Sequence, residues 1–282
     1  MSLDSDNDFA GKTVWITGAS SGIGAALARE WSSRGANIVL SARDEARLAE
    51  VASSIHTETM VEPFDVRDAD AMAAATQRAI DWKGGVDVFV ANAGISQRGQ
   101  ARDTGMQVYR DIIDIDLTAQ IAAVQALLPH MIERAEAGQP GRLVFISSIA
   151  GKVGVPLRTA YCAAKHGLIG YADALRAELV REKIAVHVIT PGSVATDVSR
   201  NALTATGEKR GVSDKAIDEG IPPAEAARSI VDAIALEQRE IVVARGMEEA
   251  MGEMRRTPDQ LFDQVGAMVE AGYIEKMMGE RK

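Results

Sequence analysis

The stretch KTVWITGASSGIGAALAREWSSR, residues 12–34, decides how the rest of the chain folds. The apolar run from Lys12 to Thr17 predicts a buried strand, and the pattern from Ala25 to Arg34 predicts a helix. The turn between them, Thr17 to Gly24, is rich in glycine. Such a turn lets the backbone approach a pyrophosphate, while the helix N-terminus supplies amides and the positive end of its dipole. A glycine-rich turn can also be only a tight turn, but its place between a strand and a helix favours a phosphate-binding loop.

Apolar runs and helical patterns alternate along most of the remaining chain. Further strands are predicted at residues 37–43, 58–64, 86–90, 143–146, 184–190 and 240–243, and further helices at 44–55, 69–82, 107–137 (interrupted at Pro129), 156–181 and 222–235. This alternation indicates one α/β domain built on a doubly wound parallel sheet. We place the domain at residues 10–245, with a polar lid at about 197–221, between a flexible N-terminus (1–9) and a helical C-terminal tail (246–282).

The composition limits the partners of this protein. Its 282 residues carry a formal net charge of −9, which argues against nucleic acid or an anionic membrane surface as the main partner. The single cysteine, Cys162, excludes an intrachain disulfide and fits a reducing compartment. The acidic N-terminus lacks the features of a secretory signal, and no apolar run approaches the roughly 18 residues of a membrane span. We expect a cytoplasmic protein without a membrane span.

A hydroxyl, a phenol and an ammonium group are expected at one edge of the predicted sheet. Tyr161 and Lys165 lie four residues apart, so in a helix they share one face. Ser148 lies thirteen residues before Tyr161, at the end of the strand predicted at 143–146. A tyrosine with its ordinary pKa of about 10 is a poor base at neutral pH, but a nearby cation favours the phenolate. Such a pair also occurs by chance on helix surfaces; with a hydroxyl at a strand end, it can perform acid–base chemistry on a carbonyl or alcohol.

The residues after the second predicted strand bear on the choice of cofactor. In dinucleotide-binding folds, an acidic residue at this point holds the adenosine ribose hydroxyls of NAD. Here Ser41 and Arg43 occupy the exit of the strand, and the first carboxylate is Asp44. An arginine suits the 2′-phosphate of NADP, so we expect NADP(H) to be preferred, with NAD(H) possible. The alternative is that Arg43 only begins the next helix on a solvated face.

Together, the motifs within residues 10–245 resemble the short-chain dehydrogenase/reductase family, in its non-extended, NADP-preferring form. Five motifs follow in the family's order: Thr17-Gly18-Ala19-Ser20-Ser21-Gly22-Ile23-Gly24, Ala91-Asn92-Ala93-Gly94, Ser148, Tyr161-x-x-x-Lys165 and Pro191-Gly192. Residues 94–98 and 151–156 further resemble the subgroup near dehydrogenase/reductase member 7 and the 11β-hydroxysteroid dehydrogenases. The resemblance implies a Rossmann-like fold and an NADP(H)-dependent oxidoreductase acting on a carbonyl or a secondary alcohol.

The resemblance also implies a role for each motif. Tyr161 would be the general acid in reduction and the base in oxidation, Lys165 would bind the nicotinamide ribose and lower the tyrosine pKa, and Ser148 would orient the substrate oxygen. The pyrophosphate would lie along Thr17, Gly18, Ser20, Ser21, Gly22, Ile23 and Gly24. The other cofactor contacts would come from Ser41 and Arg43 (2′-phosphate), Asp65 and Val66 (adenine), Asn92 and Gly94 (adjoining ribose), and Pro191, Gly192, Val194 and Thr196 (nicotinamide amide).

One residue departs from the family's pattern. The family commonly places an asparagine in the helix after the fourth strand, where it supports a water relay to the lysine, and here Asp116 takes that position. An ionised carboxylate cannot donate a hydrogen bond as an amide does. If the carboxylate points at Lys165, it would hold the ammonium and weaken its effect on Tyr161.

The sequence also suggests how the protein assembles and where its C-terminal tail packs. Members of the family usually form tetramers or dimers, which would use the helical stretches 107–137 and 156–181. The apolar positions of the tail predict packing on the core or on a neighbouring subunit, with a cover over the substrate site as the alternative. These positions are Leu261, Phe262, Val265, Met268 and Val269.

Two other functions remain open at this point. A 3-oxoacyl-carrier reductase would be favoured by a basic patch, for which Arg98, Arg102, Lys152 and Arg158 are candidates. An NADP-binding sensor or structural protein would be favoured if Asp116 marked lost activity.

Cys162 and His166 are expected to face away from the site. No metal site is predicted, because no ligand spacing links His56, His130 and His187.

Overall fold

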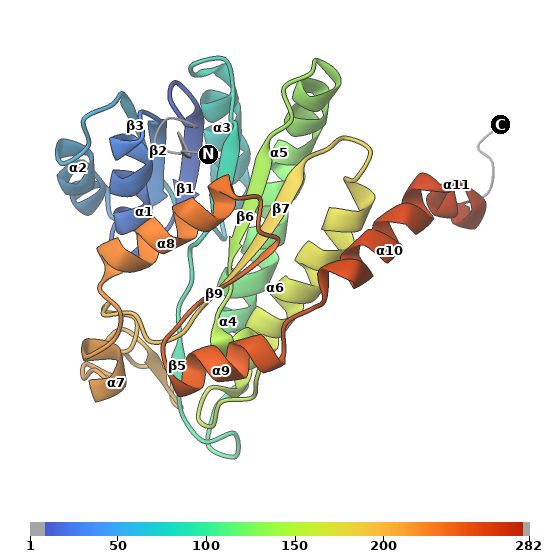
Figure 1. Ribbon diagram of the computed structural model, residues 1–282. Coiled ribbons are helices and arrows are strands. Elements are labelled where there is room, and N and C mark those ends of the chain that lie inside the picture. The colour runs from blue at the N-terminus through green and yellow to red at the C-terminus, as the bar shows by residue number, and fades with distance from the viewer. Residues whose placement is uncertain (1–8, 279–282) are drawn as a thin grey trace.

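The computed structural model describes residues 9–278 and has the predicted α/β architecture (Figure 1). Seven parallel strands form the sheet in the order β3-β2-β1-β4-β6-β7-β9. They are β1 (Thr13–Thr17), β2 (Asn37–Ala42), β3 (Thr59–Pro63), β4 (Val88–Ala91), β6 (Arg142–Ile146), β7 (Ala185–Pro191) and β9 (Glu240–Val243). The predicted flexible segment 1–9 lies outside the described residues except for Phe9, which is buried.

The strand order confirms the predicted Rossmann-like, doubly wound sheet. From β1 the chain winds outward to β3, and it then crosses to β4 and winds outward on the other side to β9. β1 pairs with β2 from Thr13 opposite Asn37 to Thr17 opposite Ser41, and with β4 on its other side. The carboxyl ends of β1 and β4 therefore lie side by side where the winding direction changes, which is the ligand-binding point of such sheets.

Helices cover both faces of the sheet. Val14 and Ile16 of β1 face a core shared with α1 and α8, whereas Trp15 faces a second core shared with α3, α5 and α6. The covering helices are α1 (Gly22–Ser33), α2 (Glu45–Ser53), α3 (Ala69–Asp81), α5 (Ala119–Glu136), α6 (Thr159–Glu178) and α8 (Pro223–Ala235). Because both faces are buried, the strands consist of nearly continuous apolar runs, which made them visible in the sequence.

The long helical stretch is interrupted at a different place from the one predicted. Pro129 lies inside α5, and the break is a π-helical turn at Asp114–Thr118, between α4 (Met106–Ile113) and α5. Proline removes one amide donor, which leaves the carbonyl of Gln125 without its helical partner. Pro129 and Gln125 are both exposed, so water can serve that carbonyl. The predicted interruption at Pro129 is therefore wrong.

Residues 106–136 are long and apolar enough, by length and composition alone, to span a membrane. A helix was predicted here but not a membrane span, because polar residues divide the stretch into short apolar runs. The core helix of a globular domain can meet the same criterion, and Ala123, Val124 and Leu127 of this stretch are buried in the core beneath α5. One such helix among the described residues is weak evidence for membrane insertion.

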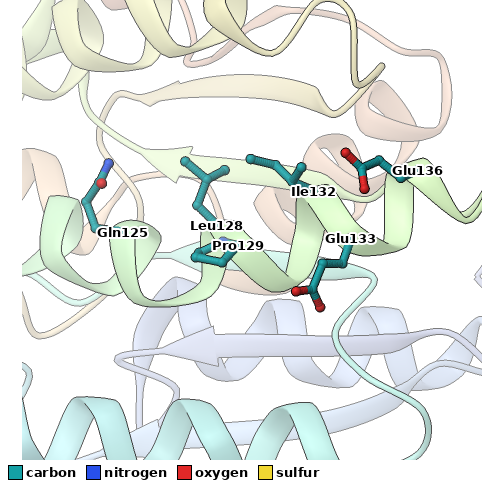
Figure 2. Close-up of a pocket in the computed structure, with 6 residues that line it drawn as sticks. All are labelled: Gln125, Leu128, Pro129, Ile132, Glu133 and Glu136. Atoms are coloured by element: carbon teal, nitrogen blue, oxygen red, sulfur yellow. The ribbon is translucent and has the colours of Figure 1, made fainter.

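Residues on one side of α5 line a pocket (Figure 2). It is lined by Gln125, Leu128, Pro129, Ile132, Glu133 and Glu136. Part of α6, the other helix predicted to form an assembly interface, is instead covered by α10 (Asp259–Glu270) of the same chain. The Arg176 guanidinium of α6 lies 4.1 Å from the centre of the Phe262 ring. Assembly through both helices stays a prediction, and the tail occupies part of the surface that it would use.

The tail folds into helices α9 (Met247–Met254), α10 and α11 (Tyr273–Met278), and α10 and α11 project away from the sheet (Figure 1). Only part of its predicted apolar face is covered. Val269 is buried and Phe262 lies under Arg176. The exposed positions are Leu261, Val265 and Met268.

The predicted lid, residues 197–221, contains the short strand β8 (Leu203–Thr204) and the short helix α7 (Lys215–Asp218). β8 pairs in parallel with β5 (Gln97–Arg98), which follows β4 in the chain. At the other end of the lid, the Ile221 amide donates to the Ser193 carbonyl at 2.9 Å. The lid therefore rests against the loops that follow β4 and β7.

Candidate active site

The motif residues meet where the parallel strands end. The glycine-rich turn follows β1, residues 92–94 follow β4, Ser148 follows β6, and residues 191–196 begin at the end of β7. These four strands are consecutive in the sheet, so their carboxyl ends deliver the four segments to one edge. The structure thus brings together the segments that the sequence analysis selected.

Two glycines allow the turn after β1 to pack closely against the turn after β4. Gly18 has a φ of +66°, and a Cβ there would lie 2.8 Å from the Cα of Ala93. A Cβ on Gly24 would lie 2.4 Å from the Gly18 carbonyl oxygen. A larger residue at either position would push the two turns apart. The segment between them keeps the N-terminus of α1 open to a phosphate, because its residues are partly or fully exposed: Ser20, Ser21, Gly22 and Ile23.

The side chains of Thr17 and Asn92 brace these turns. The Thr17 hydroxyl donates to the Val90 carbonyl at 3.2 Å. It also accepts hydrogen bonds from the amides of Asn92 and Ala93, at 3.0 and 3.1 Å. The Asn92 amide group donates back to the carbonyls of Thr17 and Gly18, at 2.8 and 3.1 Å. Thr17 is fully buried, and its hydroxyl holds β1 against β4; its contact with the pyrophosphate stays a prediction.

Ser41 has a similar structural role. Its side chain is fully buried, and its hydroxyl accepts a hydrogen bond from the Trp15 indole at 2.8 Å. The strand turns this side chain into the core beside Trp15, and the contact of Ser41 with a 2′-phosphate stays a prediction. Sequence reasoning located the strand end correctly but not the direction of the side chain.

Arg43 remains available at the same strand end. Its side chain is 66% exposed, and its nearest ionic partner is Asp65, with 3.9 Å between Nη1 and Oδ2. Asp65 is held mainly by Arg67, whose hydrogen bond lowers the pKa of Asp65 to about 2. Val66 is half-buried beside it. The structure thus brings Arg43 next to Asp65 and Val66, the residues predicted to lie near the adenine.

Ser148 begins a short 3₁₀ turn, Ile149–Gly151, after β6. Its hydroxyl accepts a hydrogen bond from the Ala150 amide at 3.1 Å and donates to the Pro191 carbonyl at 3.3 Å. The neighbouring Ser147 hydroxyl donates to the Lys165 carbonyl at 3.0 Å. The end of β6 is therefore bonded both to the loop after β7 and to α6. The hydrogen bond from Ser148 to the Pro191 carbonyl is long, so the Ser148 hydroxyl can donate instead to a ligand oxygen that accepts more strongly.

Tyr161 and Lys165 share one face of α6, as predicted. The Lys165 Nζ lies 5.6 Å from the centre of the Tyr161 ring. It donates a hydrogen bond to the Ile146 carbonyl at 3.0 Å and lies 3.2 Å from Oδ2 of Asp116. The other carboxylate oxygen of Asp116 accepts from the Ile95 amide at 2.8 Å. The carboxylate thus points at the lysine.

Burial governs the charges of this pair. It raises the pKa of Asp116, although Lys165 and the Ile95 amide act against this. Burial also acts to lower the pKa of Lys165, but Asp116 and Tyr161 outweigh it and leave that pKa raised. Lys165 therefore stays protonated at physiological pH, and the two donors that converge on Asp116 favour its ionised form. We assign a buried ion pair.

The position of Asp116 depends on features that the sequence analysis missed. Asp116 lies in the π-helical turn, a kind of irregularity that is frequent at functional sites. The buried Gln120 amide group donates to the carbonyls of Ile115 and Ala93, at 2.9 and 2.7 Å, and so supports the turn. A Cβ on Gly94 would lie 2.9 Å from Oδ2 of Asp116. Gly94 is therefore needed to leave space for the carboxylate.

Residues 191–196 lie next to the glycine-rich turn. A Cβ on Gly22 would lie 3.2 Å from the methyl group of Thr196. Pro191 and Val194 are buried, whereas Gly192, Ser193 and Thr196 are partly exposed, so a ligand would meet mainly these three residues. The segment predicted to contact the nicotinamide is thus close to the segment predicted to contact the pyrophosphate.

Glu248 of the tail helix α9 holds this loop, and the sequence analysis missed it. Its carboxylate accepts hydrogen bonds from the Ser193 amide at 2.7 Å and the Ser193 hydroxyl at 2.9 Å. A Cβ on Gly192 would lie 2.4 Å from the same carboxylate. Gly192 therefore allows the tail to approach the loop. No motif signalled this contact, because the two residues are 55 positions apart.

The other candidates lie apart from the site. Cys162 is buried near the backbone of Val153 and Val155, and His166 is exposed, so neither takes part. The four basic candidates do not form one patch: Lys152 is buried with Glu240, and Arg102 pairs with its exposed neighbour Asp103. Within residues 9–278, no group of His, Cys, Asp and Glu side chains could hold a metal ion.

A model of the short chain dehydrogenase family matches residues 12–206. The chain belongs to the short-chain dehydrogenase/reductase family. It is 36% identical over 242 residues to "Dehydrogenase/reductase SDR family member 7B" of Danio rerio, an alignment that covers 83% of this chain and 77% of the relative. The resemblance to the member 7 subgroup is thereby confirmed, and the chain is an oxidoreductase that binds NAD(P).

Solved structures of the family share the fold. A short-chain dehydrogenase/reductase from Burkholderia phymatum, in complex with NAD, superposes with a TM-score of 0.77 at 21% identity, covering 89% of this chain and 97% of that one. An alcohol dehydrogenase from Thermococcus sibiricus, complexed with 5-hydroxy-NADP, gives a TM-score of 0.71 at 22% identity, covering 83% and 96%.

We predict that the turnover of Asp116→Asn equals or exceeds that of the parent. In the oxidation direction, the increase of kcat with pH should occur at lower pH in the variant. The amide can still accept from the Ile95 amide, but it no longer offsets the Lys165 charge, so the charge favours the Tyr161 phenolate more strongly. The measurement is kcat against pH for the parent and the variant. Asp114→Asn, an exposed change in the same π-helical turn, is the control. Complete loss of turnover in Asp116→Asn alone would instead make the carboxylate functional.

We also predict that Glu248→Gln weakens cofactor binding. The amide group of glutamine cannot accept both hydrogen bonds from Ser193 as a carboxylate does, so the loop 191–196 becomes less ordered. We expect the Kd for NADPH to rise by about tenfold, which corresponds to about 1.4 kcal/mol. Fluorescence titration measures it, with the neighbouring, exposed Glu249→Gln as the control. Equal affinities in the two variants would show that the tail does not support the cofactor loop.

Proposed function

We propose that this enzyme is an NADP(H)-dependent oxidoreductase that moves a hydride between the nicotinamide and a carbonyl or secondary alcohol. The observation that supports this most strongly is the Lys165 ammonium, 5.6 Å from the Tyr161 ring, at the edge where Ser148 and the glycine-rich turn also lie. The exposed N-terminus of α1 fits a pyrophosphate, and Thr196 and the backbone of 191–194 fit the nicotinamide end. When bound, the cofactor supplies or accepts the hydride.

The residues of the site would move the proton that accompanies the hydride. Tyr161 gives a proton to the substrate oxygen in reduction and removes it in oxidation. Lys165 favours the charged phenolate in this exchange. With one N–H directed at the Ile146 carbonyl and one at Asp116, the ammonium keeps a third for the nicotinamide ribose. Ser148 donates its hydroxyl proton to the substrate oxygen as charge develops there.

The preference for NADP rests on Arg43. Its guanidinium is exposed, and its one ionic contact within the described part of the chain, to Asp65, is long, so it can turn to a 2′-phosphate with two parallel hydrogen bonds. Asp65 is already engaged by Arg67, which reduces its competition for Arg43. The strand end offers no carboxylate to ribose hydroxyls before Asp44, whose side chain caps α2.

The alternatives receive less support. A carrier-protein reductase would need the four basic candidates on one surface, but Arg98 and Arg158 meet at Asp214 while Arg102 and Lys152 pair with Asp103 and Glu240. A silent NADP-binding protein would be expected to have lost part of the acid–base group. Ser148, Tyr161 and Lys165 are all present and adjoin one edge of the sheet.

Tyr161→Phe tests the proposal. Without the phenol hydroxyl, no group takes over the proton, so we expect turnover to fall by at least about a hundredfold while NADPH still binds. NADPH and NADH oxidation against aldehydes, ketones and 3-oxoacyl thioesters measures this. Tyr171→Phe, which removes a hydroxyl bonded to Gln125, is the matched control. Turnover that survives in Tyr161→Phe would exclude the proposed role, and binding without turnover of any compound would favour the silent alternative.

The cofactor preference has its own matched pair of variants. Arg43→Ala should raise the Kd for NADPH by about tenfold or more and leave that for NADH little changed, because a charge-assisted contact is lost. Ser41→Ala should instead lower the free energy of unfolding by about 1–3 kcal/mol, because the Trp15 indole loses its buried acceptor. Titrations with both cofactors and urea unfolding separate these effects. An Arg43→Ala enzyme with unchanged NADPH affinity would overturn the preference.

A further inference from the structure

Asp214, in the lid, is shared by three arginine side chains. Arg98 of β5 approaches it with Nε and Nη2, both at 2.7 Å from Oδ2. Arg210 of the lid bonds to the other carboxylate oxygen. Arg158, at the N-cap of α6, is more distant, with 3.5 Å between its Nη2 and Oδ2. The cluster thus joins the loop after β4, the lid and the helix that carries Tyr161; β5 and α7 lie near each other in Figure 1.

The charges of this cluster do not balance. Within the described residues, Asp214 is the single carboxylate in ion-pair distance of the three guanidinium groups, so two positive charges are uncompensated. Burial acts to raise the pKa of Asp214, but the hydrogen bonds from Arg210 and Arg98 outweigh it and hold that pKa well below its usual range. Burial and the neighbouring Arg158 lower the pKa of Arg98. The surroundings thus favour a second negative charge.

The three arginines differ in how many donors they have left. Arg98 also donates to the Ser96 hydroxyl at 2.9 Å and the Gln97 carbonyl at 2.7 Å, and its side chain is only 9% exposed. Arg210 also donates to the Ser199 hydroxyl. Among residues 9–278, the Arg158 side chain makes only the long approach to Asp214, and it is 24% exposed. Arg210 makes both of its bonds through Nη1, so Arg158 is the arginine with the most donors left for a ligand.

The cluster borders the space where a substrate must lie. Arg158 comes three residues before Tyr161, so the two residues lie on the same side of α6 at its first turn. Gln97, next to Arg98, accepts a hydrogen bond from the Ala160 amide at 2.9 Å. Tyr161 packs in an apolar cluster with Ile95 and with Leu203 of the lid. An apolar surface thus lies beside the reacting phenol, with positive charge at the start of the same helix.

We propose that Arg158, supported by the charges of Arg98 and Arg210, binds an anionic group, a carboxylate or a phosphate, on the far end of the substrate. This inference rests on the proposed function and names the class of its substrate: a carbonyl or alcohol compound with an apolar middle and an anionic end. Asp214 holds the arginines in place and leaves Arg158 donors for the ligand.

The first test uses the full-length enzyme with NADPH and three sets of ketones of graded chain length: carboxylates, their methyl esters and phosphate monoesters. At low ionic strength, we expect kcat/KM of an anionic set to exceed that of the esters by about tenfold or more, mainly through KM. Arg158→Ala should lower this ratio by about tenfold, and Arg158→Lys should retain part of it. Arg200→Ala, which removes a lid charge that pairs with Asp197, should leave the ratio as in the parent.

The outcomes separate this inference from the proposed function. The anion site would be overturned if the parent enzyme had the same kcat/KM for the esters as for both anionic sets. It would also be overturned if Arg158→Ala left the ratio of these kcat/KM values unchanged. Neither result would contradict the oxidoreductase activity. A preference for one anionic set supports the site and tells carboxylate from phosphate. Added salt should lower the ratio of kcat/KM between the anionic ketones and the esters, because it screens the partly exposed guanidinium of Arg158.

A second test does not depend on turnover. With NADPH saturating, so that the cofactor's own phosphate sites are filled, sulfate should raise the thermal midpoint of the parent and of Arg200→Ala more than that of Arg158→Ala. Equal stabilisation of all three proteins would overturn the anion site even if no ketone is reduced. A selective loss in Arg158→Ala would support the site even if the proposed hydride transfer failed.

Discussion

The buried ammonium of Lys165 is the charge on which the arrangement of the site depends. A buried cation is costly unless charges and hydrogen-bond acceptors meet it. Here they come from distant parts of the chain, the Ile146 carbonyl at the end of β6 and the Asp116 carboxylate in the π-helical turn. Gly94 leaves the space in which they meet. Because Tyr161 lies one turn from Lys165 on α6, the partners that hold the lysine also position the phenol.

The sheet and the location of the site could be predicted because both follow from local patterns. Strands buried on both faces consist of continuous apolar residues, and parallel strands bring their carboxyl ends to one edge. The glycine-rich turn, Ser148 and Tyr161 all come directly after a strand or start the helix that follows. Their positions along the chain therefore gave their positions in space without knowledge of any long-range contact.

The sequence could not show the partners of buried polar groups when those partners are remote in the chain. Ser41 and Thr17 stand at strand ends as a phosphate-binding residue would, yet their hydroxyls are taken by Trp15 and by the segment from Val90 to Ala93. A pattern gives the residue type and the strand, but not the acceptor or donor that the folded chain provides. The π-helical turn escaped prediction for the same reason, since Gln120 supports it by reaching the Ala93 carbonyl of another loop.

The contact between Glu248 and Ser193 has a consequence for how the protein is made. Every strand of the sheet precedes residue 248 in the chain, so the parallel sheet can be complete on the ribosome before the tail emerges. The loop at 191–196 gains its last anchor only when α9 forms. A nascent chain that stops after β9 would thus carry the acid–base residues and the glycine-rich turn but lack this clamp. The loop 191–196 therefore obtains its complete set of contacts only in chains that have been translated through α9.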